Sequence, residues 1–220
     1  MSRRRMMQAL LGAGAVVLGG GAAGLAWLDQ RLTSKNPVKD PLPEGSGAAR
    51  SLPLTPACND GDEEPTPSVI EGPFYKPNSP QRTVLREADT VGTPLVIKGR
   101  VLSPDCVPIA GAVLDFWSCD GKGVYDNEGF RLRGHQLTDA AGVFRVETVK
   151  PSDYKDFGIH RTPHVHVRAQ GPRTGLLTTQ LFFPGEPLNA QDWLLKESLI
   201  MNVARSGDES LVARFDFVLA

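Results

Sequence analysis

Cysteine is scarce in this sequence of 220 residues, which has three copies and no CxxC pair. Without such pairs, the usual cysteine-based zinc sites lack their ligands. An excess of positive charge is also absent, since 24 lysines and arginines stand against 25 acidic residues, for a formal net charge of −1. Removing the three arginines near the N-terminus lowers that charge to −4. The sequence therefore offers no basic surface, and we expect no nucleic-acid partner.

Helical periodicity is nearly absent too, because only residues 190–204 could form a helix, and a short one. Apolar and polar residues instead alternate in short runs separated by glycine and proline, which predicts β-strands. These runs cover residues 96–102, 112–117, 143–148, 164–169, 177–183 and 211–219. Many short strands with such turns predict a single β-sandwich domain with little helix over residues 67–220.

The N-terminal region differs in composition from the rest of the chain. Residues 2–7 read Ser-Arg-Arg-Arg-Met-Met and precede an apolar, glycine-rich stretch at residues 9–28. A basic segment before a mildly apolar one is typical of a twin-arginine export signal, so we interpret residues 1–28 as that signal. A membrane anchor is the alternative, because about 20 apolar residues can cross a bilayer.

Residues 29–66 are rich in proline, glycine, serine and acidic residues, which predicts a flexible linker. Together the two N-terminal segments predict an exported protein that is periplasmic, anchored to the cell envelope or secreted. Any contact with a membrane is expected only through the N-terminal segment.

Three cysteines in an exported chain predict one disulfide and one odd, buried thiol. Cys106 and Cys119 lie on either side of the strand expected at residues 112–117, and six residues of strand span roughly 20 Å. A disulfide requires Cα atoms within about 7 Å of each other. Cys58 is therefore the better partner, for either Cys106 or Cys119.

Two of the four histidines occur as His164-Val165-His166 within an expected strand. Side chains at positions i and i+2 of a strand point the same way, so the two imidazoles form half of a transition-metal site. A pair of partly exposed strand histidines is the simpler alternative. The cupin pattern does not fit, because the next glutamate is Glu186. His160 and His135 remain candidate third ligands, but neither has a recognisable zinc spacing.

Two tyrosines lie in turns rich in glycine and proline. Tyr125 follows Gly-Val at residues 123–124, and Tyr154 ends the segment Lys-Pro-Ser-Asp-Tyr at residues 150–154. Taken singly, each tyrosine is better explained as a packed residue with one hydrogen bond. A trivalent metal, however, favours the phenolate form. Two phenolates and two neutral imidazoles suit oxidised iron better than zinc or calcium.

Seven segments now combine into a resemblance that covers roughly residues 66–190. They are residues 71–75, 111–117, 123–125, 138–142, 150–154, 161–166 and 178–180. In these segments and in their order, the chain resembles the intradiol ring-cleavage dioxygenases. Those are non-haem iron(III) enzymes that use O2 to open a catechol between its hydroxyl-bearing carbons, giving a cis,cis-muconate-type product. The family fold is a β-sandwich with the metal on strand ends and loops.

The resemblance implies a ligand set for Fe(3+). Carried over by position, Tyr125, Tyr154, His164 and His166 are the iron ligands, with Tyr125 and His166 equatorial and the other two axial. Tyr154 is then the phenolate that leaves when the substrate chelates the iron, which gives it a catalytic role as well.

Four further residues match family positions near the substrate. Arg161 matches an arginine that stabilises negative charge on the substrate, and Gln180 matches a glutamine that hydrogen-bonds near it. Phe74 and Tyr75 match residues that line the substrate pocket. Taken alone, Arg161 and Gln180 look like ordinary polar strand residues, and Phe74 and Tyr75 are equally consistent with packing.

The expected partners are a small aromatic diol and O2, in a chain that could be a homo-oligomer. The sequence also fits two rival functions in part. One is a non-catalytic, transthyretin-like periplasmic binding module, and the other is a zinc hydrolase that uses His164, His166 and His160. An iron(III)–phenolate protein is coloured, whereas a zinc protein is colourless and a binding module holds no stoichiometric metal.

Overall fold

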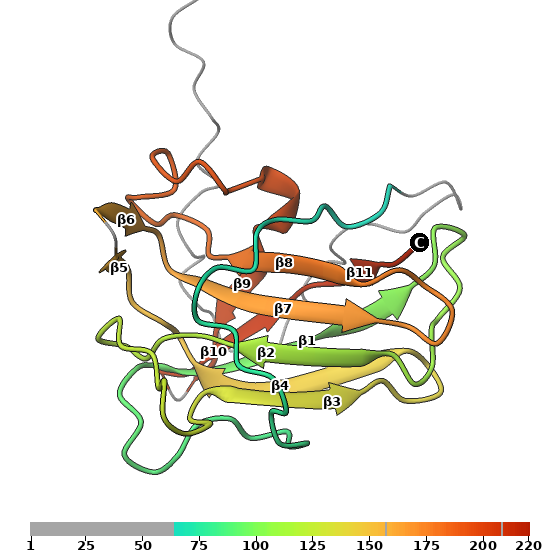
Figure 1. The fold of residues 1–220 in the computed structure, drawn as a ribbon, viewed down its shortest axis with the longest axis horizontal. Helices are drawn as coiled ribbons and strands as arrows, with labels where there is room; N and C mark the ends of the chain where they lie inside the picture. Colours follow the sequence, from blue (N-terminus) through green and yellow to red (C-terminus); the bar gives the residue numbers. More distant parts are fainter. Residues whose placement is uncertain (1–63, 157, 208) are drawn as a thin grey trace, which may run out of the picture. The chain divides into compact units, whose positions relative to one another are not determined.

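The computed structural model describes residues 64–156, 158–207 and 209–220, which are coloured in Figure 1. Strands make up nearly all of the regular structure in these ranges. They are β1 (Pro94–Leu102), β2 (Val113–Trp117), β3 (Arg133–Leu137), β4 (Val143–Val149), β5 (Tyr154–Asp156), β6 (Ile159–Arg161), β7 (His164–Gln170), β8 (Leu177–Phe182), β9 (Asn202–Arg205), β10 (Leu211–Arg214) and β11 (Phe217–Val218). Within the same ranges the one helical segment is the short 3-10 helix η1 (Glu197–Leu199). The predicted mainly-β fold class is confirmed.

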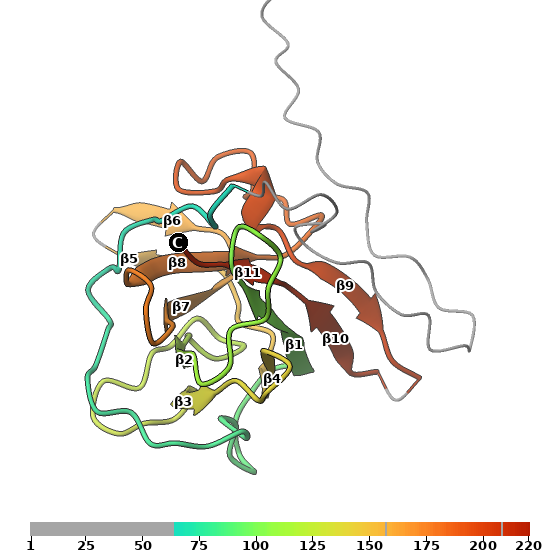
Figure 2. The ribbon, with the colours of Figure 1, turned by 90° about the vertical axis from the view of Figure 1, so that its right-hand side faces the viewer.

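The strands form two larger sheets and one hairpin (Figure 1, Figure 2). One sheet has the order β11-β1-β10-β9, with β4 also paired to β1, and the other has the order β3-β2-β7-β8. β5 and β6 form a two-stranded sheet of their own. The hydrophobic core joins both larger sheets, with Ile97 and Phe144 from the first and Leu114 and Val167 from the second. This is the sandwich that the alternating pattern predicted.

The C-terminal run at residues 211–219 is interrupted, which the sequence pattern did not predict. It forms β10 and β11, separated at Phe215 and Asp216. Asp216 is fully buried, and its carboxylate accepts hydrogen bonds from the Arg100 amide at 2.8 Å and from the Arg214 Nε at 3.2 Å. The Asp216 side chain thus replaces one backbone hydrogen bond of the sheet, because its carboxylate accepts from the Arg100 amide in place of a backbone carbonyl.

Residues 190–204, which could form a short helix, contain only the three-residue 3-10 helix η1, followed by β9. Leu199, Ile200 and Met201 are buried one after another. Consecutive burial does not suit a surface helix, whose apolar residues recur every three or four positions.

The described part of the chain begins beside its last strand. The Thr66 amide donates to the Val218 carbonyl at 2.9 Å, and the Thr66 hydroxyl accepts from the Val218 amide at 2.8 Å. The expected signal at residues 1–28 and nearly all of the expected linker at residues 29–66 lie outside the described residues. Across the described ranges, no helix has the length and apolar character needed to span a membrane.

The two cysteines within the described residues are one bridged residue and one thiol. Cys106 is disulfide-bonded, whereas Cys119 is free and buried. A bridge between Cys106 and Cys119 is therefore excluded, as the length of the intervening strand predicted. The expected partner, Cys58, lies outside the described residues.

Candidate metal centre

β7 carries the two histidines on the face of its sheet that points away from the hydrophobic core. Val165 and Val167 enter the core, and His164 and His166 alternate with them on the opposite face. Both histidines are only 1% exposed, because other segments cover that face. Their ring centroids lie 4.7 Å apart and their Nε2 atoms 3.1 Å apart. The pair thus shares one face, as predicted.

Burial keeps both imidazoles neutral. The Nδ1 of His164 lies 2.7 Å from the Thr162 carbonyl oxygen, which can only accept, so Nδ1 carries the proton and Nε2 keeps a lone pair. Burial, and then the charge of Arg161, lower the pKa of His164 to about 4. Burial, and then the neighbouring His164, lower the pKa of His166 well below its usual value. The neutral imidazole is the form that binds a transition metal.

Two tyrosines join the histidines in one cluster of rings. The Tyr125 ring centroid lies 5.4 Å from that of Tyr154 and 6.3 Å from that of His166. The Tyr154 ring lies 5.6 Å from the His164 ring. The fold therefore brings together all four candidate ligands, which come from a loop, the hairpin strand β5 and β7.

The Tyr125 hydroxyl is buried and has no hydrogen-bond partner. Burial, and then the repulsion from Tyr154 when both phenols are ionised, raise the pKa of Tyr125 well above its usual value. A buried polar group without a partner is costly. A bound cation would remove that cost, because it ligates the oxygen and favours the phenolate. Phenolate oxygens beside neutral imidazole nitrogens form a donor set that fits ferric iron.

Close backbone packing fixes the distance between the two tyrosines. Gly123 has a φ of +79°, and a Cβ at this position would lie 2.7 Å from the Asp153 carbonyl oxygen and 3.1 Å from the Tyr154 Cβ. Glycine is therefore needed here, both for the backbone conformation and for the close approach. The loop that bears Tyr125 can then lie against the segment that bears Tyr154.

Arg161 lies at the end of β6, directly opposite Tyr154 in the β5–β6 hairpin. It is 8% exposed, and its Nε donates to the Asp192 carboxylate at 2.8 Å. One Nη donates to the Gln180 Oε1 at 2.6 Å, and the Gln180 amide nitrogen donates to the Ile70 carbonyl at 3.0 Å. The structure therefore places the two predicted residues, Arg161 and Gln180, in direct contact.

Phe74 and Tyr75 contact the cluster in different ways. The Phe74 ring stacks on Tyr125 at 4.2 Å and meets the edge of Tyr154 at 6.0 Å. The Tyr75 hydroxyl donates to the Asp115 carboxylate at 3.3 Å, and its ring meets Trp117 at 5.0 Å. Phe74 thus contacts both candidate tyrosine ligands, whereas the Tyr75 hydroxyl is hydrogen-bonded to a residue of β2.

The other two histidines have their own partners. The His160 Nε2 lies 2.6 Å from the Asp153 carboxylate, and the His135 Nδ1 lies 3.1 Å from the Ser79 hydroxyl. Neither histidine joins the His164–His166 pair. Over the ranges that the structure describes, no cluster of three or more His, Cys, Asp or Glu could hold a metal ion.

Sequence reasoning did not single out three residues that shape this site. Asp192 fixes Arg161, but its segment carries no chemical motif. The Trp117 ring stacks on His166 at 4.8 Å with an interplanar angle of 7°. Arg133 is 2% exposed behind Tyr125. Strand pairing could have suggested Trp117, since it lies opposite His166 in the register of β2 and β7. Nothing in the sequence marks Arg133 as buried.

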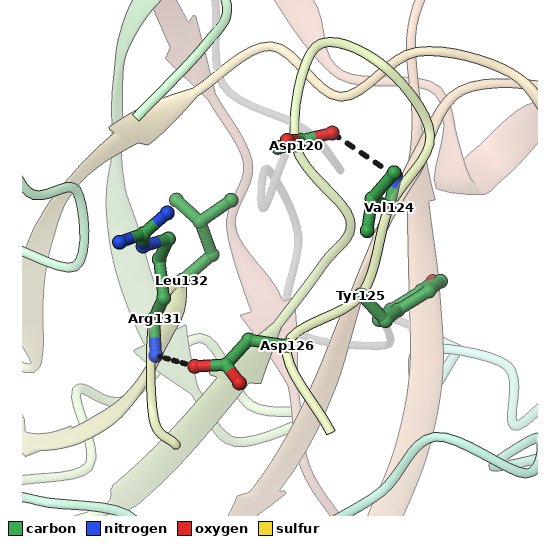
Figure 3. A pocket seen from close by; sticks show the side chains of 6 residues that line it. All are labelled: Asp120, Val124, Tyr125, Asp126, Arg131 and Leu132. Carbon is green, nitrogen blue, oxygen red and sulfur yellow. Dashed lines mark hydrogen bonds between the residues drawn. The ribbon is translucent and has the colours of Figure 1, made fainter. Parts of the chain in front are cut away.

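A pocket of about 300 Å³ lies beside the loop that bears Tyr125 (Figure 3). It is lined by Asp120, Val124, Tyr125, Asp126, Arg131 and Leu132. The Asp120 carboxylate accepts from the Val124 amide at 3.0 Å, and the Asp126 carboxylate accepts from the Arg131 amide at 2.9 Å. These carboxylates therefore shape the loop that presents Tyr125.

Residues 70–220 match the sequence model of a dioxygenase family. Among solved structures, this chain is 47% identical to the dioxygenase domain of a dioxygenase carbohydrate-binding protein fusion from the cellulolytic bacterium Streptomyces sp. SirexAA-E. That comparison has a TM-score of 0.65 and covers 71% of this chain and 98% of the other.

Curated relatives point the same way. Catechol 1,2-dioxygenase 1 of Acinetobacter lwoffii is 31% identical, over 80% of this chain and 66% of that enzyme. Catechol 1,2-dioxygenase of Candida albicans is 28% identical, over 70% of this chain and 60% of that enzyme. The chain thus spans about two thirds or less of the length of these two relatives. With a family match that covers most of its residues, this chain belongs to the intradiol ring-cleavage dioxygenase family.

Proposed function

We propose that this protein is an iron(III) intradiol dioxygenase. It cleaves a catechol-type aromatic diol between its two hydroxylated carbons with O2 and releases a cis,cis-muconate-type product. The observation that carries the proposal is the buried cluster of two phenols and two neutral imidazoles. Support comes from relatives named as catechol and hydroxyquinol 1,2-dioxygenases.

Tyr125, Tyr154, His164 and His166 are the residues that hold the iron. When bound, the iron supplies the Lewis acidity that draws both oxygens of a catechol and makes the ring reactive toward O2. The neutral His164 and the buried Tyr125 hydroxyl, which has no hydrogen-bond partner, support this assignment.

Of the two tyrosines, Tyr154 is the one that would take a proton from the substrate. It is partly buried, whereas Tyr125 is 8% exposed and stacked under Phe74. Tyr154 also lies on the smallest sheet of the fold, the hairpin of two three-residue strands. As a phenolate, Tyr154 would accept a proton at its Oη, so it would serve as a base for one catechol hydroxyl.

Arg161 supplies a fixed positive charge beside the reacting ring. Its contacts with Asp192 and Gln180 orient the guanidinium before the substrate arrives. A preorganised donor of this kind stabilises negative charge that develops during the reaction. Both ends of the Gln180 amide are occupied by protein groups, so Gln180 acts by positioning Arg161.

The test combines metal analysis, a visible spectrum and product analysis. Protein loaded with iron should hold one ion per chain and be red-brown, because phenolate transfers charge to iron(III). A panel of catechol, protocatechuate, hydroxyquinol and a chlorocatechol then identifies the substrate, with O2 consumption and a muconate product as the readout. A colourless zinc protein would indicate a hydrolase, and a protein without stoichiometric metal would indicate a binding module. Either result would overturn the proposal.

We further propose that the protein works outside the cytoplasm. The N-terminal composition supports export, and the disulfide at Cys106 supports it independently, because disulfides persist in oxidising compartments. Export of the folded protein suits a chain that must take up its metal before it crosses the membrane.

A further inference from the structure

A buried arginine lies behind one of the candidate tyrosine ligands. Arg133 is the first residue of β3 and is 2% exposed. None of the ion pairs among the described residues includes Arg133. A buried cation without a carboxylate partner is rare, because the loss of hydration is not offset by an opposite charge. The buried charge of Arg133 must therefore be stabilised by groups other than a paired carboxylate.

The hydrogen bonds of Arg133 join the two segments that flank Tyr125. Its Nε donates to the carbonyl of Asp126, the next residue in the chain, at 2.9 Å. Its Nη1 donates to the carbonyl of Phe74, whose ring stacks on Tyr125, at 2.5 Å. One rigid, planar guanidinium thus ties the backbone next to Tyr125 to the backbone of its stacking partner.

The positive charge of Arg133 also faces the Tyr125 ring. The guanidinium carbon lies 6.0 Å from the ring centroid, at the limit of a cation–π contact. The hydrogen bonds and the ring contact therefore both associate Arg133 with Tyr125.

We propose that Arg133 is a positioning residue for Tyr125, whose guanidinium provides the counter-charge for the Tyr125 phenolate and whose two carbonyl contacts fix the ring. The inference rests on the proposed function, because Tyr125 is a phenolate only when it binds iron. Arg133 touches neither substrate nor metal in this role. It sets how strongly the Tyr125 oxygen donates electrons to the iron.

The decisive measurements are the phenolate-to-iron(III) absorption band and the iron reduction potential, on protein loaded with iron. Arg133→Gln removes the charge, so the phenolate becomes a stronger donor. We expect the band to move to longer wavelength and the reduction potential to fall. Arg145→Gln is the matched control. Arg145 lies on β4 and pairs at the surface with Glu147, so its loss should leave both readouts unchanged.

Arg133→Lys separates the effect of the positive charge from that of the two carbonyl contacts. It tests the inference even if the glutamine variant does not fold. Lysine keeps the charge but cannot bridge two carbonyls with a planar fork. The band and the potential should stay at the wild-type position while the melting temperature falls. A lysine variant with shifted band and potential, or a folded glutamine variant without any shift, would overturn the inference alone. A wild-type protein without the band would overturn the proposed function and this inference together.

Discussion

At the residue scale, His164 and His166 stay neutral because burial lowers the pKa of each. Alanine at either position removes one of four candidate ligands. We expect His164→Ala and His166→Ala to lose most of the iron and the colour together, as measured by metal analysis and visible absorption. His160→Ala is the control, because His160 pairs with Asp153 and should retain both. Full iron and colour in His164→Ala and His166→Ala would show that the pair is structural.

Arg161 offers a second test at this scale. Arg161→Lys keeps the charge but loses the planar fork that contacts both Asp192 and Gln180. Iron content, colour and anaerobic catechol binding should survive. Turnover with O2 should fall about 10²- to 10³-fold, the usual effect of removing one preorganised donor. The measurement is the single-turnover reaction of the preformed enzyme–catechol complex with O2. Reaction at the wild-type rate would leave Arg161 without a catalytic role.

Cys119 is protected by burial. Burial, and then the charge of Asp120, raise the pKa of the Cys119 thiol to about 12. At pH 8 only about one molecule in 10⁴ then carries the reactive thiolate. We expect no alkylation of native protein by iodoacetamide over an hour, and one alkylated cysteine in guanidinium chloride without a reducing agent, both counted by mass spectrometry. Rapid alkylation of the native protein would contradict the burial of Cys119.

The sequence identified the candidate ligands more readily than the groups that support them. His164 and His166 were recognisable because strand alternation places them on one face. Arg133 and Asp192 were not, because their roles depend on contacts with Phe74 and Arg161, which are distant in sequence. Local patterns report which way a side chain points, but they do not report what another loop brings to it.

At the scale of elements, β1 is the central strand of its sheet, and its Gly99 lies close against the backbone of Phe215. A Cβ on Gly99 would lie 1.6 Å from the Phe215 carbonyl oxygen. We expect Gly99→Ala to destabilise the protein by about 3 kcal/mol or more, as measured by urea unfolding. Gly207→Ala is the control, because no heavy atom lies within 4 Å of its added methyl group. That change should stay within about 0.5 kcal/mol. A Gly99→Ala protein that unfolds at the wild-type urea concentration would contradict the contact.

Strands were predictable where apolar and polar residues alternate, as in β1, β4 and β7. β3 was missed because Arg133-Gly134-His135-Gln136-Leu137 has no such alternation, although it pairs with β2 along its whole length. Residues 190–204 show a related effect, since Leu199, Ile200 and Met201 are buried in succession and the Met201 amide donates to the Phe182 carbonyl of β8. Pairing partners, which a single segment does not reveal, decided both elements.

At the scale of the whole molecule, export can be tested through the N-terminal arginines. A twin-arginine signal is read by its receptor, and lysine should not replace the arginines. We expect lysine at positions 3–5 to retain the protein inside the cell, as followed by fractionation and immunoblotting. Arg50→Lys, in the expected linker, should leave export unchanged. Normal export of the triple variant would contradict the signal.

The β5–β6 hairpin holds Tyr154 and Arg161 opposite each other, in strands of three residues. A mutation that moves the hairpin would therefore displace the proposed base and the proposed charge-stabilising residue together. Changes in substrate range should then be easiest to obtain at positions outside the hairpin. Ile70 and Val124 each adjoin the site and are 53% and 61% exposed. A directed-evolution library aimed at new aromatic diols should randomise those two positions and leave the hairpin intact.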